Sequence, residues 1–185
     1  DLYRFNSSNV IGKIPGRRKN SGALLFMGHW DHLGICAPEG APDRICNGAV
    51  DNASGIAVMN EVAEALAKKK HDRDIYFLAT TAEESGLLGA YAFAEKPVLP
   101  LDQIILSLNI DTIAIAPRGS KVAIIGRGTT PLDAAVESVA RKTGRAIEAS
   151  ADANAFLQRQ DGWALTQKGV PALMVGGSFA DLNLM

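Results

Sequence analysis

Side chains of the types that bind divalent metal ions follow three separate apolar stretches of this chain. The stretches and the groups after them are 23–28 with His29, 74–82 with Glu83-Glu84, and 103–110 with Asp111. Imidazole and carboxylate groups are common protein ligands of zinc. Short apolar runs predict buried parallel strands, and sites in open α/β sheets form at the carboxyl ends of such strands. The sequence therefore predicts that these groups meet at one rim and form a metal site with hydrolytic chemistry.

Two further carboxylates stand where they can serve that site. Asp31 lies two residues after His29, and a metal-bound histidine needs its second ring nitrogen held by a carboxylate or a carbonyl. Asp51 lies in the segment 48–55, directly before a helical pattern, and its two oxygens could bridge two metal ions. Taken singly, the first pattern also fits a surface turn and the second an ordinary helix cap.

The adjacent carboxylates Glu83 and Glu84 are the most informative pair. They repel one another beyond a buried strand unless cations lie nearby. Because neighbouring side chains point in different directions, one can bind a metal while the other acts as a general base on water. Asp111 follows an almost wholly apolar run, where a carboxylate is costly unless it is exposed or paired with a cation. Singly, these groups would also fit a solvated loop end or a helix cap; together they favour a metal site.

Strands must alternate with helices to position these groups. Apolar residues recur at helical spacing over 54–70, with Asn52 or Ser54 as the N-cap, and a small-residue helix is expected over 87–94. The remaining expected elements are a strand at 122–125, a helix from Thr130-Pro131 to Arg141, a short helix over 161–168 and a last strand at 172–175. This alternation predicts an α/β fold with a largely parallel sheet, and residues 34–47 are expected to form a loop.

Length and charge exclude several classes of protein. The chain has 185 residues, enough for a single domain with a sizeable core. Its formal net charge of −1 gives no basic surface for nucleic acid, and no apolar stretch is long enough for a membrane span. Cys36 and Cys46 share one loop, where they could form a disulfide, remain free thiols or, less plausibly, bind metal.

Four ordered motifs resemble peptidase family M28, a family of zinc peptidases. They are GHWDHLG (28–34), NGAVDNASG (47–55), EESGLLG (83–89) and NID (109–111). The resemblance runs through nearly the whole chain, from residue 9 to residue 172. It implies a three-layer α/β sandwich, with a mostly parallel central sheet and helices on both faces. It also implies the co-catalytic di-zinc aminopeptidase type of activity on peptide substrates, with the oligomeric state left open.

The resemblance assigns a role to each candidate residue. It implies one zinc ion on His29 and Asp111, a second on Glu84, Asp51 as the bridge, Glu83 as the general base, and Asp31 as the group that orients His29. In this reading two zinc ions activate a water molecule, and an exopeptidase removes N-terminal residues. Asp161 matches a commonly acidic position near the substrate, and the specificity pocket is expected from residues 34–47, 156–163 and 178 onward.

One ligand that the resemblance implies is missing from the sequence. Relatives hold the second zinc with a further histidine late in the chain, but the histidines here are His29, His32 and His71. His71 lies in a charged run and is expected to face solvent, and His32 belongs to the first motif, so neither fits the late position by sequence order. Since catalytic zinc normally has three protein ligands, we expect a domain truncated at its C-terminus that holds the second zinc weakly, if at all.

Two other functions remain open. One is a single-zinc acyltransferase like glutaminyl cyclase, which would reuse one carboxylate as acid and base. The other is a non-catalytic, receptor-like homologue; such proteins usually lose ligands, whereas here the ligands apart from the late histidine are present. The resemblance and the cysteine pair together lead us to expect a periplasmic or secreted protein.

Overall fold

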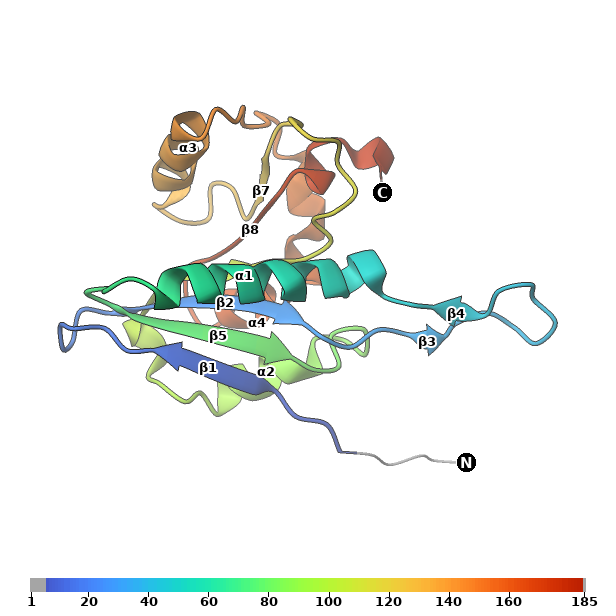
Figure 1. Ribbon diagram of the computed structural model, residues 1–185, viewed down its shortest axis with the longest axis horizontal. Coiled ribbons are helices and arrows are strands. Elements are labelled where there is room, and N and C mark those ends of the chain that lie inside the picture. The colour runs from blue at the N-terminus through green and yellow to red at the C-terminus, as the bar shows by residue number, and fades with distance from the viewer. Residues whose placement is uncertain (1–5, 185) are drawn as a thin grey trace.

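The computed structural model describes residues 6–184 and is built around a six-stranded sheet in the order β1-β5-β2-β6-β8-β7. The strands are β1 (Val10–Ile14), β2 (Ala23–His29), β5 (Asp74–Thr80), β6 (Ile104–Asn109), β7 (Ala123–Ile125) and β8 (Ala172–Gly176). The four central strands run parallel, and β1 and β7 are antiparallel to their neighbours at the two edges. The mostly parallel sheet predicted from the apolar runs is confirmed (Figure 1).

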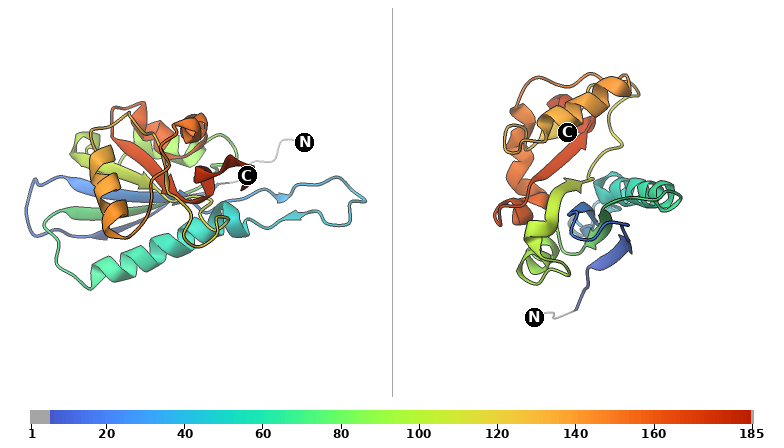
Figure 2. Two further views of the ribbon diagram at one scale, coloured as in Figure 1. Left: turned by 90° about the horizontal axis from the view of Figure 1, so that it is seen from above. Right: turned by 90° about the vertical axis from the view of Figure 1, so that its left-hand side faces the viewer.

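Helices cover both faces of the sheet, as Figures 1 and 2 show. One face carries α1, and the other carries α2 and α4. The helices are α1 (Gly55–Ala67), α2 (Leu88–Glu95), α3 (Asp133–Lys142) and α4 (Gly162–Thr166), with short helical turns at η1 (Ala49–Ser54), η2 (Leu101–Gln103), η3 (Asp152–Arg159), η4 (Ser178–Ala180) and η5 (Leu182–Leu184). The fold is the three-layer α/β sandwich that the resemblance implies.

Alternation along β2 explains why both faces are covered. Leu25 and Met27 belong to the core that α2 and α4 close, whereas Phe26 points the other way. On that side Phe26 stacks on Phe77 of β5 with ring centroids 5.4 Å apart, against the apolar side of α1. Because each central strand is buried on both faces, its sequence is a continuous apolar run rather than an alternating one.

The structure differs from the predicted elements in three places, the third being the segment 34–47. The helix expected from Thr130-Pro131 begins at Asp133, because the Thr130 hydroxyl accepts the main-chain N–H of Leu132 and closes a turn before the helix. Edge strand β1 was not predicted, since its residues are largely exposed and form no apolar run.

Residues 34–47, expected as a loop, contain a short hairpin of β3 (Gly34–Ile35) and β4 (Ile45–Cys46). A disulfide joins Cys36 to Cys46, with Cα atoms 5.8 Å apart. Figure 2 shows the hairpin projecting from the body of the domain. Within residues 6–184, no helix has both the length and the apolar composition needed to cross a membrane.

Candidate metal centre

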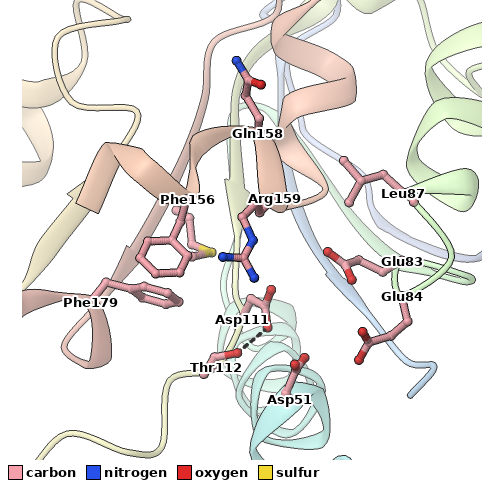
Figure 3. Close-up of a pocket in the computed structure, with 12 residues that line it drawn as sticks. Asp51, Glu83, Glu84, Leu87, Asp111, Thr112, Phe156, Gln158, Arg159 and Phe179 are labelled. Atoms are coloured by element: carbon pink, nitrogen blue, oxygen red, sulfur yellow. Dashed lines mark hydrogen bonds between the residues drawn. The ribbon is translucent and has the colours of Figure 1, made fainter. Parts of the chain in front are cut away.

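The carboxyl ends of β2, β5 and β6 lie at one edge of the sheet and bring the predicted groups together. The central strands are parallel neighbours, so their carboxyl ends open on the same side. A pocket of about 350 Å³ lies there, and its acidic lining residues are Asp51, Glu83, Glu84 and Asp111 (Figure 3). These side chains come from three separate sequence motifs, and tertiary structure collects them at one site.

His29, Asp51 and Asp111 form the first of two metal-ligand clusters. His29 is the last residue of β2, and its side chain is 1% exposed. Its Nε2 lies 2.9 Å from Oδ1 of Asp51 and 3.4 Å from Oδ1 of Asp111. One buried imidazole nitrogen with two carboxylates around it is a donor set that zinc binds.

The other ring nitrogen of His29 is held by Asp31, in a way the sequence did not suggest. Nδ1 of His29 lies 3.0 Å from the main-chain carbonyl oxygen of Asp31 and 3.7 Å from its carboxylate. The carboxylate instead accepts the main-chain N–H groups of Glu83 and Glu84. When His29 carries its proton on Nδ1 and donates it to the Asp31 carbonyl, the lone pair on Nε2 is free to bind a metal ion. Asp31 therefore contacts both the histidine and the glutamate pair.

Asn52 fixes the distance between Asp51 and Asp111. Its side chain is buried, donates from Nδ2 to the carbonyl of Ile110, and accepts at Oδ1 the main-chain N–H groups of Gly55 and Thr112. The start of α1 is thereby tied to the end of β6. A Cβ at Gly55 would lie 2.2 Å from Oδ1 of Asn52 and 2.3 Å from the Ile110 carbonyl oxygen, so only glycine permits this approach.

His32, Asp51 and Glu84 form the second cluster. Nδ1 of His32 lies 2.5 Å from Oε1 of Glu84. Asp51 belongs to both clusters, which is the arrangement expected of a residue that bridges two metal ions. The sequence assigned no role to His32, yet the fold brings it beside Glu84. Its spacing of three residues from His29 was the available signal, but the partner lies 52 residues further along the chain.

Packing at Gly48 holds His32 in this position. Gly48 has φ +68°, and a Cβ there would lie 2.7 Å from Cβ of His32. The third histidine, His71, lies at the far end of α1, where its Nε2 is 2.7 Å from the carbonyl oxygen of Leu66. It is half-buried rather than exposed as expected, because it folds back onto the helix end.

Unpartnered polar atoms show that the two clusters fit metal ions. Nε2 of His29, Nδ1 of His32 and Oε1 of Glu84 are buried and have no hydrogen-bond partner among residues 6–184. Each nevertheless lies within 3.4 Å of a ligand atom from another residue of its cluster. A cation placed between these atoms would satisfy them together. Buried polar atoms without such a partner would be costly.

Glu83 lies beside the clusters without belonging to either. Burial raises the pKa of its carboxyl group to about 8, against the opposing effect of His29. Ala82, directly before it, has φ 54°, a left-handed conformation that is rare for residues with a Cβ. Backbone strain of this kind concentrates at functional sites. The geometry thus separates the adjacent glutamates into a metal-ligand candidate and a proton-binding group.

Asp161 lies beneath the site and not in it. Its side chain is 0% exposed, and one carboxylate oxygen accepts a hydrogen bond from the Thr80 hydroxyl at 2.5 Å. It is not among the residues that line the pocket. Asp161 is buried behind Thr80, the last residue of β5, and its expected place near the substrate stays a prediction.

Aromatic side chains form the wall of the pocket opposite the glutamates. Phe156 of η3 and Phe179 of η4 contact edge to face with ring centroids 5.1 Å apart, and Arg159 points into the space beside them (Figure 3). Trp163 of α4 packs against the core and does not line the pocket. Of the segments expected to form the specificity pocket, 156–163 and 178 onward contribute to it, whereas the hairpin at 34–47 does not.

The stability of the metal-free protein is expected to fall as pH rises from about 5 to about 9. Burial lowers the pKa of His29, but Asp111 and Asp51 beside it raise it overall to about 11. Burial raises the pKa of Glu83 to about 8 and that of Asp161 to about 7. Each group therefore binds its proton more tightly in the folded state, and the stability this provides is lost as pH rises through the folded pKa.

Urea unfolding in EDTA across that pH range measures this slope. Asp161→Asn should flatten the part of the curve below about pH 7, and zinc should stabilise the protein more at high pH because it replaces a proton at His29. A free energy of unfolding that increases with pH over this interval would contradict the assignment.

The fold is a three-layer α/β sandwich, and the two clusters form a candidate metal centre at the rim of its sheet. The sequence model of peptidase family M28 matches residues 9–183, and the chain belongs to this family. A vacuolar membrane protease of Candida glabrata is 34% identical over 93 residues, covering 50% of this chain and 9% of the relative. The aminopeptidase NAALADL1 of Rattus norvegicus is 28% identical over 165 residues, covering 85% of this chain and 19% of the relative. The chain thus spans a small part of these relatives' length.

Solved structures of the same fold include both zinc aminopeptidases and glutaminyl cyclases. BSAP, a zinc aminopeptidase from Bacillus subtilis, superposes with a TM-score of 0.69 at 22% identity, over 91% of this chain and 39% of that one. A glutaminyl cyclase from Porphyromonas gingivalis superposes with a TM-score of 0.68 at 20% identity, over 90% and 62% of the chains. At these identities the likeness establishes the fold and does not choose between the two activities.

Proposed function

We propose that this chain forms the catalytic site of a zinc-dependent exopeptidase that removes N-terminal residues from peptides. The observation that carries the proposal is the pair of metal-ligand clusters that share Asp51 and flank Glu83. Membership of peptidase family M28 supports it independently.

The first metal ion would be held by His29, Asp51 and Asp111, and the second by Asp51, Glu84 and His32. Zinc in these positions would polarise the scissile carbonyl and lower the pKa of the water that attacks it. The weak second site expected from the sequence rested on only two protein ligands there. His32 offers a third, which is the number usual in catalytic zinc sites.

Glu83 would act as the general base of the reaction. It lines the pocket without belonging to either cluster, so its carboxylate stays available to take a proton from water and pass it to the leaving amine. The raised pKa of Glu83, about 8, supports this role, because an efficient base has a pKa near the working pH.

A peptide assay with product identification tests the proposal. The zinc-loaded protein should release the first amino acid from peptides with a free amino terminus and leave N-acetylated peptides intact; EDTA should stop the reaction and added zinc restore it. Cleavage inside acetylated peptides would contradict exopeptidase action. Cyclisation of N-terminal glutamine without peptide cleavage would establish the acyltransferase alternative, and peptide binding without turnover the receptor-like one.

We also propose that the protein acts in an oxidising compartment, the periplasm or the cell exterior. The disulfide between Cys36 and Cys46 supports this location, since such bonds persist where glutathione does not reduce them. Alkylation of unreduced protein from its source cells should label neither cysteine, and labelling of both would refute the proposal.

A further inference from the structure

Arg159 is the cation of an otherwise acidic pocket. It lies at the end of η3 and lines the same space as the four carboxylates at the site (Figure 3). Arg127 and Arg141 both form ion pairs with Glu137. Arg159, in contrast, has no carboxylate partner within residues 6–184. A guanidinium group in this position retains all its hydrogen-bond donors for a ligand.

The surroundings of Arg159 hold it toward the pocket. Its guanidinium carbon lies 5.3 Å from the ring centroid of Phe156, a cation–π contact on the pocket wall. The two residues that follow, Gln160 and Asp161, are fully buried. Gln160 accepts the main-chain N–H of Gly162 and donates to the Leu157 carbonyl, so the backbone on the far side of Arg159 is fixed.

The charges that surround Arg159 favour an anionic ligand beside it. Four carboxylates line the pocket: Asp51, Glu83, Glu84 and Asp111. Two divalent metal ions would balance these four charges, and Arg159 would then remain as an uncompensated positive charge beside the reaction centre. Because guanidinium matches the planar geometry of a carboxylate and can bind it with two parallel hydrogen bonds, the site attracts that ligand.

We propose that Arg159 binds a carboxylate of the substrate and makes this site selective for peptides with a carboxylate near the scissile bond. The inference rests on the proposed peptidase function and names its substrate class. That carboxylate has two possible sources: the C-terminal group of a dipeptide, or an acidic side chain on the residue after the cleaved bond.

Three alanyl peptides distinguish these sources: alanyl-leucine has a terminal carboxylate, alanyl-leucine amide has none, and alanyl-aspartic acid α-amide has only a side-chain carboxylate. The measurements are KM and kcat for hydrolysis and, by calorimetry, the Kd of the zinc-loaded protein. The variants are Arg159→Gln, Arg159→Lys and the control Arg18→Gln, which removes an exposed cation at the opposite end of β2.

We expect at least one carboxylate peptide to bind more tightly than the amide, and Arg159→Gln to raise its KM about 10- to 100-fold with kcat little changed. Arg159→Lys should recover part of the loss, since a point charge replaces the planar fork. Arg159→Gln should leave the KM of the neutral amide unchanged. Arg18→Gln should have wild-type KM and kcat with every peptide. The peptide that responds identifies the source of the carboxylate.

Equal losses for the charged and neutral peptides in Arg159→Gln would overturn the proposal, because they indicate a structural role. So would a wild-type protein that does not prefer either carboxylate peptide. If no peptide is hydrolysed, the proposed peptidase function fails, and the calorimetric Kd values still decide whether Arg159 selects carboxylates.

Discussion

Replacing Glu83 with Gln is expected to lower kcat by roughly 10²–10⁴-fold while the bound metal stays unchanged. The amide has nearly the same shape but cannot take a proton from water at neutral pH. Glu83 belongs to neither metal-ligand cluster, so its loss should spare the ligands. Zinc content by atomic absorption and kcat with an aminoacyl amide substrate measure the two quantities on one preparation.

Two variants serve as controls for this result. Glu84→Gln, next in sequence, should lose the second metal because Glu84 lies in the cluster with His32. Glu61→Gln, at an exposed position on α1, should behave as the wild type. Normal turnover by Glu83→Gln would refute its role as a base, and loss of zinc from that variant would make it a ligand instead.

Asp51→Asn is expected to lower the affinity for both metal ions at once, each by more than about 100-fold. The reason is that Asp51 is common to both clusters. Asp111→Asn should lower the affinity for the first metal ion only, and His32→Asn the affinity for the second only. Competition titration with a zinc chelator resolves the two affinities, and the absorption spectrum of the cobalt-substituted protein reports the ligands directly.

Asp102→Asn, an exposed carboxylate in η2 away from the pocket, is the matched control and should leave both affinities unchanged. Melting of each variant in EDTA separates lost affinity from lost folding. If His32→Asn leaves the second affinity intact, His32 is not a ligand and the weak second site expected from the sequence stands. If Asp51→Asn weakens one metal alone, Asp51 does not bridge.

Much of the fold could be predicted because the strands that build it are buried on both faces. The runs that end at His29, before Glu83 and before Asp111 are the central strands β2, β5 and β6. Burial on both faces requires apolar residues throughout, and this pattern is visible in sequence without any knowledge of partners. Edge strand β1 and the β3–β4 hairpin were missed because their residues are largely exposed and obey no such requirement.

The local sequence pattern shows which residue types stand at the ends of the central strands, and it therefore predicts that His29, Glu84 and Asp111 meet. Parallel strands of similar length end at the same rim, so this part of the site follows from local pattern. Only the folded structure shows that His32 lies 2.5 Å from Glu84 and that Arg159 lines the pocket. Those positions depend on how loops pack after the strands end, through close contacts such as that of His32 with Gly48. Packing between residues distant in sequence leaves no periodic pattern, and so only the folded chain reveals it.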